Sequence, residues 1–375
     1  MIFNSEAVTL GQKTDKEFNS ETISAEDFRQ PTYTPDGHYL DIAGKPYFRA
    51  LLAVRHIFKN ATDEYWGNRV GAKNMDLFML TPSISSPMGP GSDSESIEIK
   101  FGNLNTHLVD SSQFGFEPML MNGVDKVYCY LPSMRGENPD KRHINQFYHC
   151  EAEIRGTIED LTPLIESYVK FLAQAFLGAP NLIKLISVSP KDTKGSLEQI
   201  LSKDSFDRIN FDKAIKLLTD NGHSHLIRKT RHGRILCSDA ELALMKILNS
   251  RTPVWIENFD RDTVAFYQKP NPHDSDKVIN ADLIFPQITP DSFGGEVLGA
   301  GQRQDKVEEI IESLERQEID KEAYDWYINL RKQNEYRMTS GFGLGVERFL
   351  TWMLVKDDIK DVIFYPRLKN VQTNP

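Results

Sequence analysis

Apolar side chains recur at helical spacing in the middle of the chain. The first helix is predicted from seven positions, which are Leu161, Leu164, Ile165, Tyr168, Val169, Phe171 and Leu172. The same spacing predicts helices over 211–218 and 236–249. Charged residues dominate 305–332, which we interpret as helical with a solvated face. The prolines of 268–274 predict a loop.

Residues 341–348 follow a different pattern and read GFGLGVER. In a strand, successive side chains point to opposite faces, so the glycines would leave one face bare enough for a flat ring. The next apolar residues return to helical spacing, which predicts Arg348 in the first turn of a helix. A cation beside a helix start suits a nucleotide triphosphate tail. The third glycine comes one residue too early for the fingerprint G-x-G-x-x-G.

A second segment with candidate chemistry lies upstream. Arg135 stands before a short loop, Arg142 and His143 follow that loop, and a strand is predicted over 147–154. Two arginines, a histidine and the ring of Phe147 on one hairpin can hold phosphates and stack a base. Either segment alone is more often explained by packing or by a solvated turn, but the two in this order favour a nucleotide site.

Composition narrows the class of protein. The chain has 375 residues, of which 39% are hydrophobic and 26% charged, as in ordinary globular proteins. No apolar run approaches membrane-spanning length and no leader pattern opens the chain, so we expect a cytoplasmic protein without a membrane partner. The cysteines Cys129, Cys150 and Cys237 lack zinc-site spacing and are predicted to be buried and reduced. A net charge of −10 weakens the case for tRNA without excluding it, and we interpret the basic run 228–234 as a solvated loop.

The ordered segments resemble the catalytic core of class II aminoacyl-tRNA synthetases, most closely asparaginyl-tRNA synthetase in the aspartate/asparagine/lysine branch. Arg135 and Glu137 match the motif 2 pattern F-R-x-E, and 142–147 match R-H-x-x-E-F. The glycine run matches motif 3, and 47–82 resemble motif 1, through which we expect a homodimer. Further matches lie at 111–113, 281–283, 295–303 and 361–367. The resemblance covers about residues 40 to 370 and implies an α+β fold with a central antiparallel sheet flanked by helices.

The resemblance also sets an expected domain organisation. We predict a poorly ordered N-terminal arm over 1–40 and a catalytic domain over 41–375, with a helical insertion at about 157–250. Synthetases of this branch normally carry an N-terminal barrel of roughly a hundred residues that reads the anticodon. The arm is too short for such a barrel, so we expect the anticodon-binding domain to be missing.

The chemistry implied by the resemblance is activation of an amino acid by ATP with Mg²⁺, giving an aminoacyl-adenylate and pyrophosphate. Arg135 would bridge the α-phosphate and the carboxylate, and Arg348 and His143 would hold the γ-phosphate. Arg135 and Arg348 are therefore the expected catalytic residues. Phe147 would stack on the adenine.

Five further residues complete the implied nucleotide and metal site. The adenine would lie over Gly343 and Gly345, and Glu137 would contact its edge. Asp282 and Glu296 match the acids that hold Mg²⁺ in this branch, and Glu296 would also belong to the ATP site.

Substrate selectivity is expected to rest on Gln113, Glu117, Arg303 and Glu241. Aspartyl enzymes place a lysine where this chain has Phe116, whereas asparaginyl enzymes place a glutamate at the position of Glu117. A glutamate there would favour the side-chain amide of asparagine.

The same residues fit a second interpretation. Aspartate could enter reversed, with its α-ammonium on Glu117 and its α-carboxylate on Arg303, and its adenylate would give asparagine with ammonia. Stand-alone asparagine synthetases resemble this core without the anticodon domain.

Three departures from the family pattern lie near the expected site. Gln146 stands where motif 2 has a glutamate, Thr339 stands where a histidine precedes motif 3, and 287–293 form an extra stretch. We interpret them as a changed substrate or acceptor with activation retained. We favour a small amine acceptor, with transfer to tRNA as the alternative and a non-catalytic binding paralogue as a further one.

Overall fold

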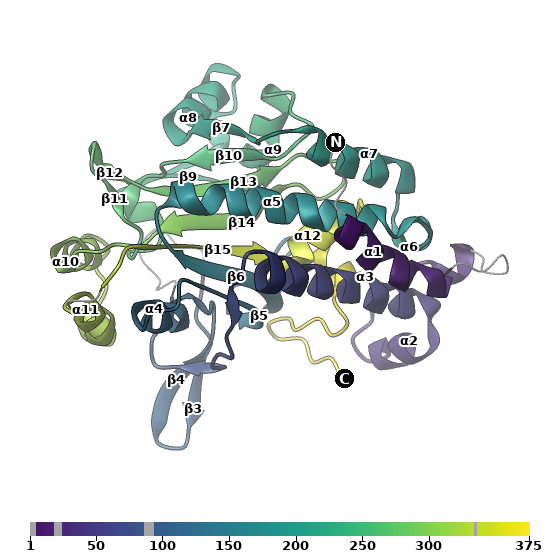
Figure 1. Ribbon diagram of the computed structural model, residues 1–375, viewed down its shortest axis with the longest axis horizontal. Coiled ribbons are helices and arrows are strands. Elements are labelled where there is room, and N and C mark those ends of the chain that lie inside the picture. The colour runs from purple at the N-terminus through teal and green to yellow at the C-terminus, as the bar shows by residue number, and fades with distance from the viewer. Residues whose placement is uncertain (1–4, 19–24, 86–93, 334–335) are drawn as a thin grey trace.

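The computed structural model describes residues 5–18, 25–85, 94–333 and 336–375. An eight-stranded sheet organises this part of the chain, in the order β1-β5-β6-β15-β14-β13-β10-β7 (Figure 1). Its strands are β1 (Lys73–Asn74), β5 (Lys126–Met134), β6 (Gln146–Arg155), β15 (Thr339–Gly345), β14 (Gly295–Gln302), β13 (Asn280–Phe285), β10 (Val254–Glu257) and β7 (Asp207–Asn210). The central strands pair antiparallel, and the edge strands β1 and β7 pair parallel with their neighbours. The predicted α+β fold with a central antiparallel sheet is confirmed.

Strand β15 divides the sheet into two unlike faces. Its apolar residue Phe342 points to one face, where its ring centroid lies 5.1 Å from that of Trp66 and 6.2 Å from that of Tyr168. Gly341 and Gly343 point to the other face. They pair with Gly301 and Gly299 of β14 on one side, and with Glu153 and Glu151 of β6 on the other. The sheet therefore has an apolar face and a polar, glycine-lined face.

Long helices cover the apolar face, as Figure 1 shows for α3 and α5. These helices are α1 (Ser5–Asp15), α3 (Pro46–Asp63), α5 (Ile158–Leu177) and α12 (Val346–Met353). α5 begins at a capping box, in which Thr157 and Asp160 each accept a hydrogen bond from the other's backbone N–H. The predicted strand at 341–345 and the predicted helix after it are both present, with Arg348 in the first turn of α12.

The described part of the predicted arm differs from the expectation of poor order, because α1 packs against α3 and α5. Gly11 allows the close approach, since a Cβ there would lie only 2.0 Å from the carbonyl oxygen of Ala175. Asp15 accepts hydrogen bonds from the backbone of Leu182 and the side chain of Asn181. Small residues at a helix contact leave no apolar periodicity, which is why the sequence did not predict this helix. Residues 1–4 and 19–24 lie outside the described residues.

The predicted helical insertion is helical but also contributes to the sheet. Its helices after α5 are α6 (Pro180–Ile186), α7 (Pro190–Ser202), α8 (Phe211–Asp220) and α9 (Ser238–Ile247). Helices α5, α8 and α9 confirm the three helices that were predicted in this region. Strand β7 joins the main sheet as its edge, and the basic run forms a hairpin of β8 (Ile227–Thr230) and β9 (Gly233–Leu236). In that hairpin Arg231 pairs with Glu318 and Arg234 pairs with Asp260. Part of the predicted loop 268–274 is a second hairpin, of β11 (Pro270–Asn271) and β12 (Asp274–Val278).

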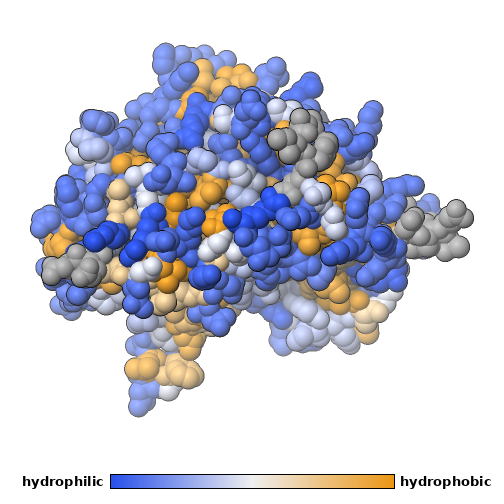
Figure 2. All heavy atoms as spheres, viewed as in Figure 1, coloured by the Kyte–Doolittle hydropathy of each residue, from blue (hydrophilic) through white to orange (hydrophobic). Residues whose placement is uncertain are grey.

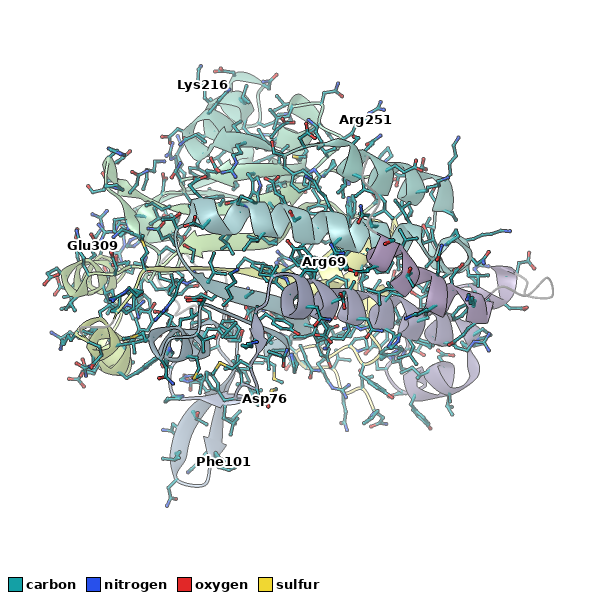
Figure 3. All side chains as sticks on the ribbon, viewed as in Figure 1. Arg69, Asp76, Phe101, Lys216, Arg251 and Glu309 are labelled. Carbon is teal, nitrogen blue, oxygen red and sulfur yellow. The ribbon has the colours of Figure 1, made fainter. Side chains whose placement is uncertain are left out.

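Seven further helices and strands lie outside the main sheet. They are α2 (His38–Gly44), β2 (Leu80–Thr81), β3 (Glu98–Phe101), β4 (Leu104–Leu108), α4 (Gln113–Met121), α10 (Val307–Arg316) and α11 (Asp325–Arg331). β3 and β4 form a hairpin that projects from the body, with Phe101 at its tip (Figure 3). Figure 2 shows hydrophobic residues gathered on this projection within an otherwise mostly hydrophilic face.

Two further observations concern the cysteines and the length of the apolar helices. Cys129 and Cys150 are buried as expected, but Cys237 is exposed at the start of α9, so the prediction was wrong for that thiol. Within the described residues, no single helix is long and apolar enough to cross a membrane, and α5 with α6 reaches such a length only across an 86° bend.

Candidate active site

Two adjoining cavities open on the polar face of the sheet. Arg135, His149, Glu296 and Gly343 line both. The first cavity is also lined by Glu137, Arg142, His143, Ile144, Phe147, Val297, Gly345, Glu347, Arg348 and Ile359. The second is also lined by Ser111, Gln113, Glu151, Tyr267, Gln268, Asp282, Gly299, Ala300, Gly301, Arg303, Gly341 and Phe342. Strands β6, β15, β14 and β13 supply most of the wall of the second cavity, whereas the loop between β5 and β6 and the start of α12 add to the wall of the first.

One end of the first cavity is rich in positive charge. Arg348 pairs with Glu296 at 3.1 Å, and its other terminal nitrogen lies 3.3 Å from Nε2 of His143. Nδ1 of His143 lies 3.0 Å from the Asp140 carboxylate. The structure thus brings together the two side chains predicted to hold the γ-phosphate, although one comes from the loop between β5 and β6 and the other from α12.

Arg142, one of the two hairpin arginines considered from the sequence for binding phosphates, adds a further positive charge to this end. Its guanidinium lies 4.7 Å from the ring centroid of Phe293 and donates to the carbonyl of Gly294. Gly295 has φ of +94°, and a Cβ there would lie 2.6 Å from both Arg142 and Glu241. The extra stretch 287–293 therefore supplies the aromatic surface on which Arg142 rests.

The other end of the first cavity contains the predicted adenine-binding residues. The guanidinium of Arg135 lies 5.5 Å from the ring centroid of Phe147, and its Nε is buried with no hydrogen-bond partner in the described chain. Gly343 and Gly345 form the bare floor. Glu137 lies at the edge and accepts a hydrogen bond from the backbone N–H of Glu95 at 3.2 Å.

Three carboxylates gather where the two cavities meet. A Cβ on Gly299 would lie 3.2 Å from Asp282 and 3.8 Å from Glu296, so both acids face the same bare glycine. Burial and the neighbouring Glu296 raise the pKa of Asp282 well above its usual range. Burial opposes ionisation of Glu296, but Arg348 outweighs it and the pKa of Glu296 is lowered. Burial raises the pKa of Glu241 to about 7.

Asp282 and Glu296 suit a Mg²⁺ ion. Magnesium usually takes one or two carboxylates and completes its shell with phosphate oxygens and water. Among the described residues no group of three or more His, Cys, Asp or Glu side chains is arranged to hold a metal by itself. The two acids beside a phosphate-binding cavity fit that sharing of ligands.

Glu241 lies with this cluster and not beside Gln113 and Arg303, so its predicted contact with the amino acid is corrected. Its carboxylate accepts the backbone N–H of Glu296 at 2.9 Å and lies 3.6 Å from Arg142. The helix that carries it, α9, packs against β13 and β14 behind the phosphate end.

The second cavity ends at a buried ion pair. Arg303 pairs with Glu153 at 3.1 Å, and their side chains are 5% and 0% exposed. Thr339 donates to the other carboxylate oxygen of Glu153 at 2.6 Å. Gln113 and Gln268 each have one buried amide atom without a hydrogen-bond partner in the described chain. Gln268 was missed, because it stands in a proline-rich turn that carries no recognisable motif.

Glu117 does not line either cavity, which corrects its predicted contact with the substrate. Its side chain is fully buried and pairs with Arg331 of α11 at 2.5 Å. It also accepts a hydrogen bond from the hydroxyl of Tyr327 at 2.6 Å. Glu117 therefore belongs to a buried polar cluster behind the cavity wall.

A further buried carboxylate, that of Glu151, lines the second cavity. It accepts hydrogen bonds from Ser111 Oγ and the Ser112 backbone N–H, each at 2.6 Å, and lies 3.2 Å from Nδ1 of His149. Burial opposes ionisation of Glu151, but His149 and the two serines outweigh it and lower the pKa to about 2.

Comparison with known proteins assigns the chain to a family. Residues 37–369 match the family described as tRNA synthetases class II (D, K and N). The chain belongs to this family. It is 30% identical over 350 residues to the asparagine--tRNA ligase of Mycoplasma pneumoniae, covering 88% of this chain and 71% of the relative. It is 29% identical over 325 residues to the enzyme of the same name from Desulforamulus reducens, covering 86% and 70%.

A solved structure extends the comparison. The asparaginyl-tRNA synthetase from Pyrococcus horikoshii, complexed with asparaginyl-adenylate, superimposes with a TM-score of 0.79 at 25% identity and covers 90% of this chain and 73% of that one. The fold is the class II synthetase fold, and this class II synthetase is a ligase of the asparaginyl-tRNA synthetase type.

Proposed function

We propose that this class II synthetase activates asparagine with ATP and Mg²⁺ and passes the asparaginyl group to tRNA. The observation that carries the proposal is the position of Arg135, which lines both cavities and has a buried Nε without a partner in the described chain. A donor at that boundary can bridge the α-phosphate of ATP and the carboxylate of an amino acid.

In the activation step the α-carboxylate oxygen attacks the α-phosphorus, the new P–O bond forms, and pyrophosphate leaves. Such transfers depend chiefly on positioning and on neutralising charge. Arg135 would act at the α-phosphate, whereas Arg348, His143 and Arg142 would hold the leaving pyrophosphate. Mg²⁺, held by Asp282 and Glu296, would neutralise phosphate charge.

Asparagine is favoured over aspartate because the charges at the end of the second cavity are already balanced. Arg303 is paired with Glu153, and Arg331 is paired with Glu117. A side-chain carboxylate would add an uncompensated buried charge there, whereas an amide would not. The unpartnered amide atoms of Gln113 and Gln268 offer hydrogen bonds to a polar substrate.

Transfer to tRNA is better supported than the amide formation that we favoured from the sequence. Both sequence-based orientations of the substrate used Glu117, which is bound to Arg331 outside the cavity and therefore supports neither. The relatives reported above are named asparagine--tRNA ligases, which supports tRNA as the acceptor. We also propose a homodimer through motif 1 and a cytoplasmic location.

The test is exchange of labelled pyrophosphate into ATP with asparagine or aspartate, followed by charging of tRNA. Asparagine-dependent exchange and formation of asparaginyl-tRNA are expected. Exchange with aspartate alone, followed by asparagine release when ammonia is added, would replace this proposal with amide synthesis. Absence of exchange with every amino acid would indicate a binding paralogue.

A further inference from the structure

His149 lies at the boundary of the two cavities and takes no part in the activation step described above. Of the four residues that line both cavities, Arg135 is a cation and Gly343 has no side chain. Glu296 is paired with Arg348. His149 is the remaining one, and its imidazole faces the boundary that an adenylate spanning the two cavities would cross.

The imidazole of His149 is oriented by its neighbours. Nδ1 lies 2.9 Å from Ser133 Oγ and 3.2 Å from the Glu151 carboxylate, and the ring meets Phe147 edge-on with centroids 4.8 Å apart. A carboxylate beside Nδ1 favours the tautomer with its proton there, which leaves Nε2 as an acceptor. Nε2 makes no hydrogen bond within the part of the chain that the structure describes.

The nearby carboxylates are less available as proton acceptors. Both oxygens of Glu151 accept hydrogen bonds from Ser111 and Ser112, Glu296 is bound to Arg348, and Asp282 would be occupied by Mg²⁺ in the proposed function. The free nitrogen of His149 is therefore the acceptor that the geometry leaves open at the cavity boundary.

We propose that His149 is the general base of the transfer step, an inference that rests on the proposed function. The terminal ribose hydroxyl of tRNA attacks the carbonyl carbon of the adenylate. The new C–O bond forms as the bond from that carbon to the phosphate oxygen breaks, and AMP leaves with the electron pair. The proton of the hydroxyl passes to Nε2 of His149. A positioned base of this kind contributes about 10²- to 10⁴-fold to a rate.

The experiment separates the two half-reactions in H149Q and H149A. Pyrophosphate exchange measures activation, and single-turnover reaction of the isolated enzyme–adenylate complex with the acceptor that the wild type uses, tRNA or ammonia, measures transfer. We expect both variants to keep exchange within a few-fold and to lose about 10²-fold or more in transfer. Added imidazole should restore part of the transfer rate to H149A but not to H149Q, whose glutamine occupies the space.

The matched control is H225A, in an exposed turn that contacts neither cavity. Equal loss of exchange and transfer in the His149 variants, unchanged transfer, or a transfer defect in H149A that imidazole does not relieve would overturn the proposal. Failure of the proposed function is a separate result, because it would appear as missing asparagine-dependent exchange in the wild type.

Discussion

Arg303 donates to Glu153 from both Nε, at 3.3 Å, and Nη2, at 3.1 Å, at the closed end of the second cavity. The pair comes from β6 and from the residue that follows β14, so two non-adjacent strands of the sheet set the charge that a substrate side chain meets. Because Glu153 neutralises the charge of Arg303, we expect Glu153 to influence which amino acid is bound, although Glu153 does not itself line the cavity.

E153Q should therefore relax selectivity. Loss of the anionic partner leaves Arg303 able to balance an aspartate side chain, so the ratio of kcat/KM for asparagine over aspartate should fall about tenfold, or about 1.4 kcal/mol. Pyrophosphate exchange with each amino acid measures this ratio. E257Q, which alters a more exposed pair with Arg208, is the matched control. An unchanged ratio in a folded E153Q protein would remove Glu153 from selectivity.

G341A should damage amino-acid binding through sterics alone. A Cβ at this position would lie 2.5 Å from Nη2 of Arg303 and 2.8 Å from Glu153. The displaced guanidinium should cost about 10²-fold in kcat/KM for asparagine, as small misplacements in active sites do. G195A, at a helical position with open space around it, should leave the kinetics unchanged and gain up to about 1 kcal/mol of stability. Normal asparagine kinetics in G341A would contradict the placement of Arg303.

R348A should lower asparagine-dependent pyrophosphate exchange by about 10²- to 10³-fold, because the variant loses the cation beside His143 and Glu296. R316A removes an arginine paired with Asp262 at the surface and serves as the control. Full exchange activity in R348A would refute the assignment of the phosphate-binding end.

The variant E241Q distinguishes the position of Glu241 in the structure, beside Glu296 and Arg142, from its predicted position beside the amino acid. Because its carboxylate holds the Glu296 backbone and faces Arg142, the KM for ATP should rise about tenfold while the KM for asparagine stays unchanged. D239N, exposed on the same helix, is the control. A rise confined to the KM for asparagine would restore the sequence-based assignment.

Acid should destabilise the fold through Glu151. Its pKa is lowered from 4.5 to about 2 in the folded protein, so its stabilising contribution is complete above pH 4.5 and is lost as the pH falls toward 2. The contribution at neutral pH is about 3 kcal/mol. Urea unfolding of wild type and E151Q between about pH 3 and pH 7 should show a difference in unfolding free energy that shrinks as the pH falls. A difference that does not vary with pH would rule out this source of acid sensitivity.

The sequence predicted the catalytic face best where local pattern and chemistry coincide. The glycines of β15 and Arg348 of α12 are adjacent in the chain, and alternation followed by helical spacing describes both elements. The proximity of Arg348 and His143 could be predicted from the order of the motifs alone, because the sheet brings those motifs together.

Selectivity residues were harder to place, because their partners come from distant elements. Glu117 is bound by Tyr327 of α11, 210 residues further along the chain, and no local pattern announces that contact. Gln268 and His149 line the cavities, but no sequence motif marks either residue. The helix over 5–15 was missed because its contact depends on Gly11, a residue that weakens any helical prediction.

The division of β15 into a bare face and an aromatic face has a consequence for the length of this strand. A shift of one residue in its register would turn Phe342 into the nucleotide site and press the glycines against Trp66 and Tyr168. An insertion or deletion of a single residue within Thr339–Gly345 would thus abolish the nucleotide site and, at the same time, disrupt the packing of the core against this strand.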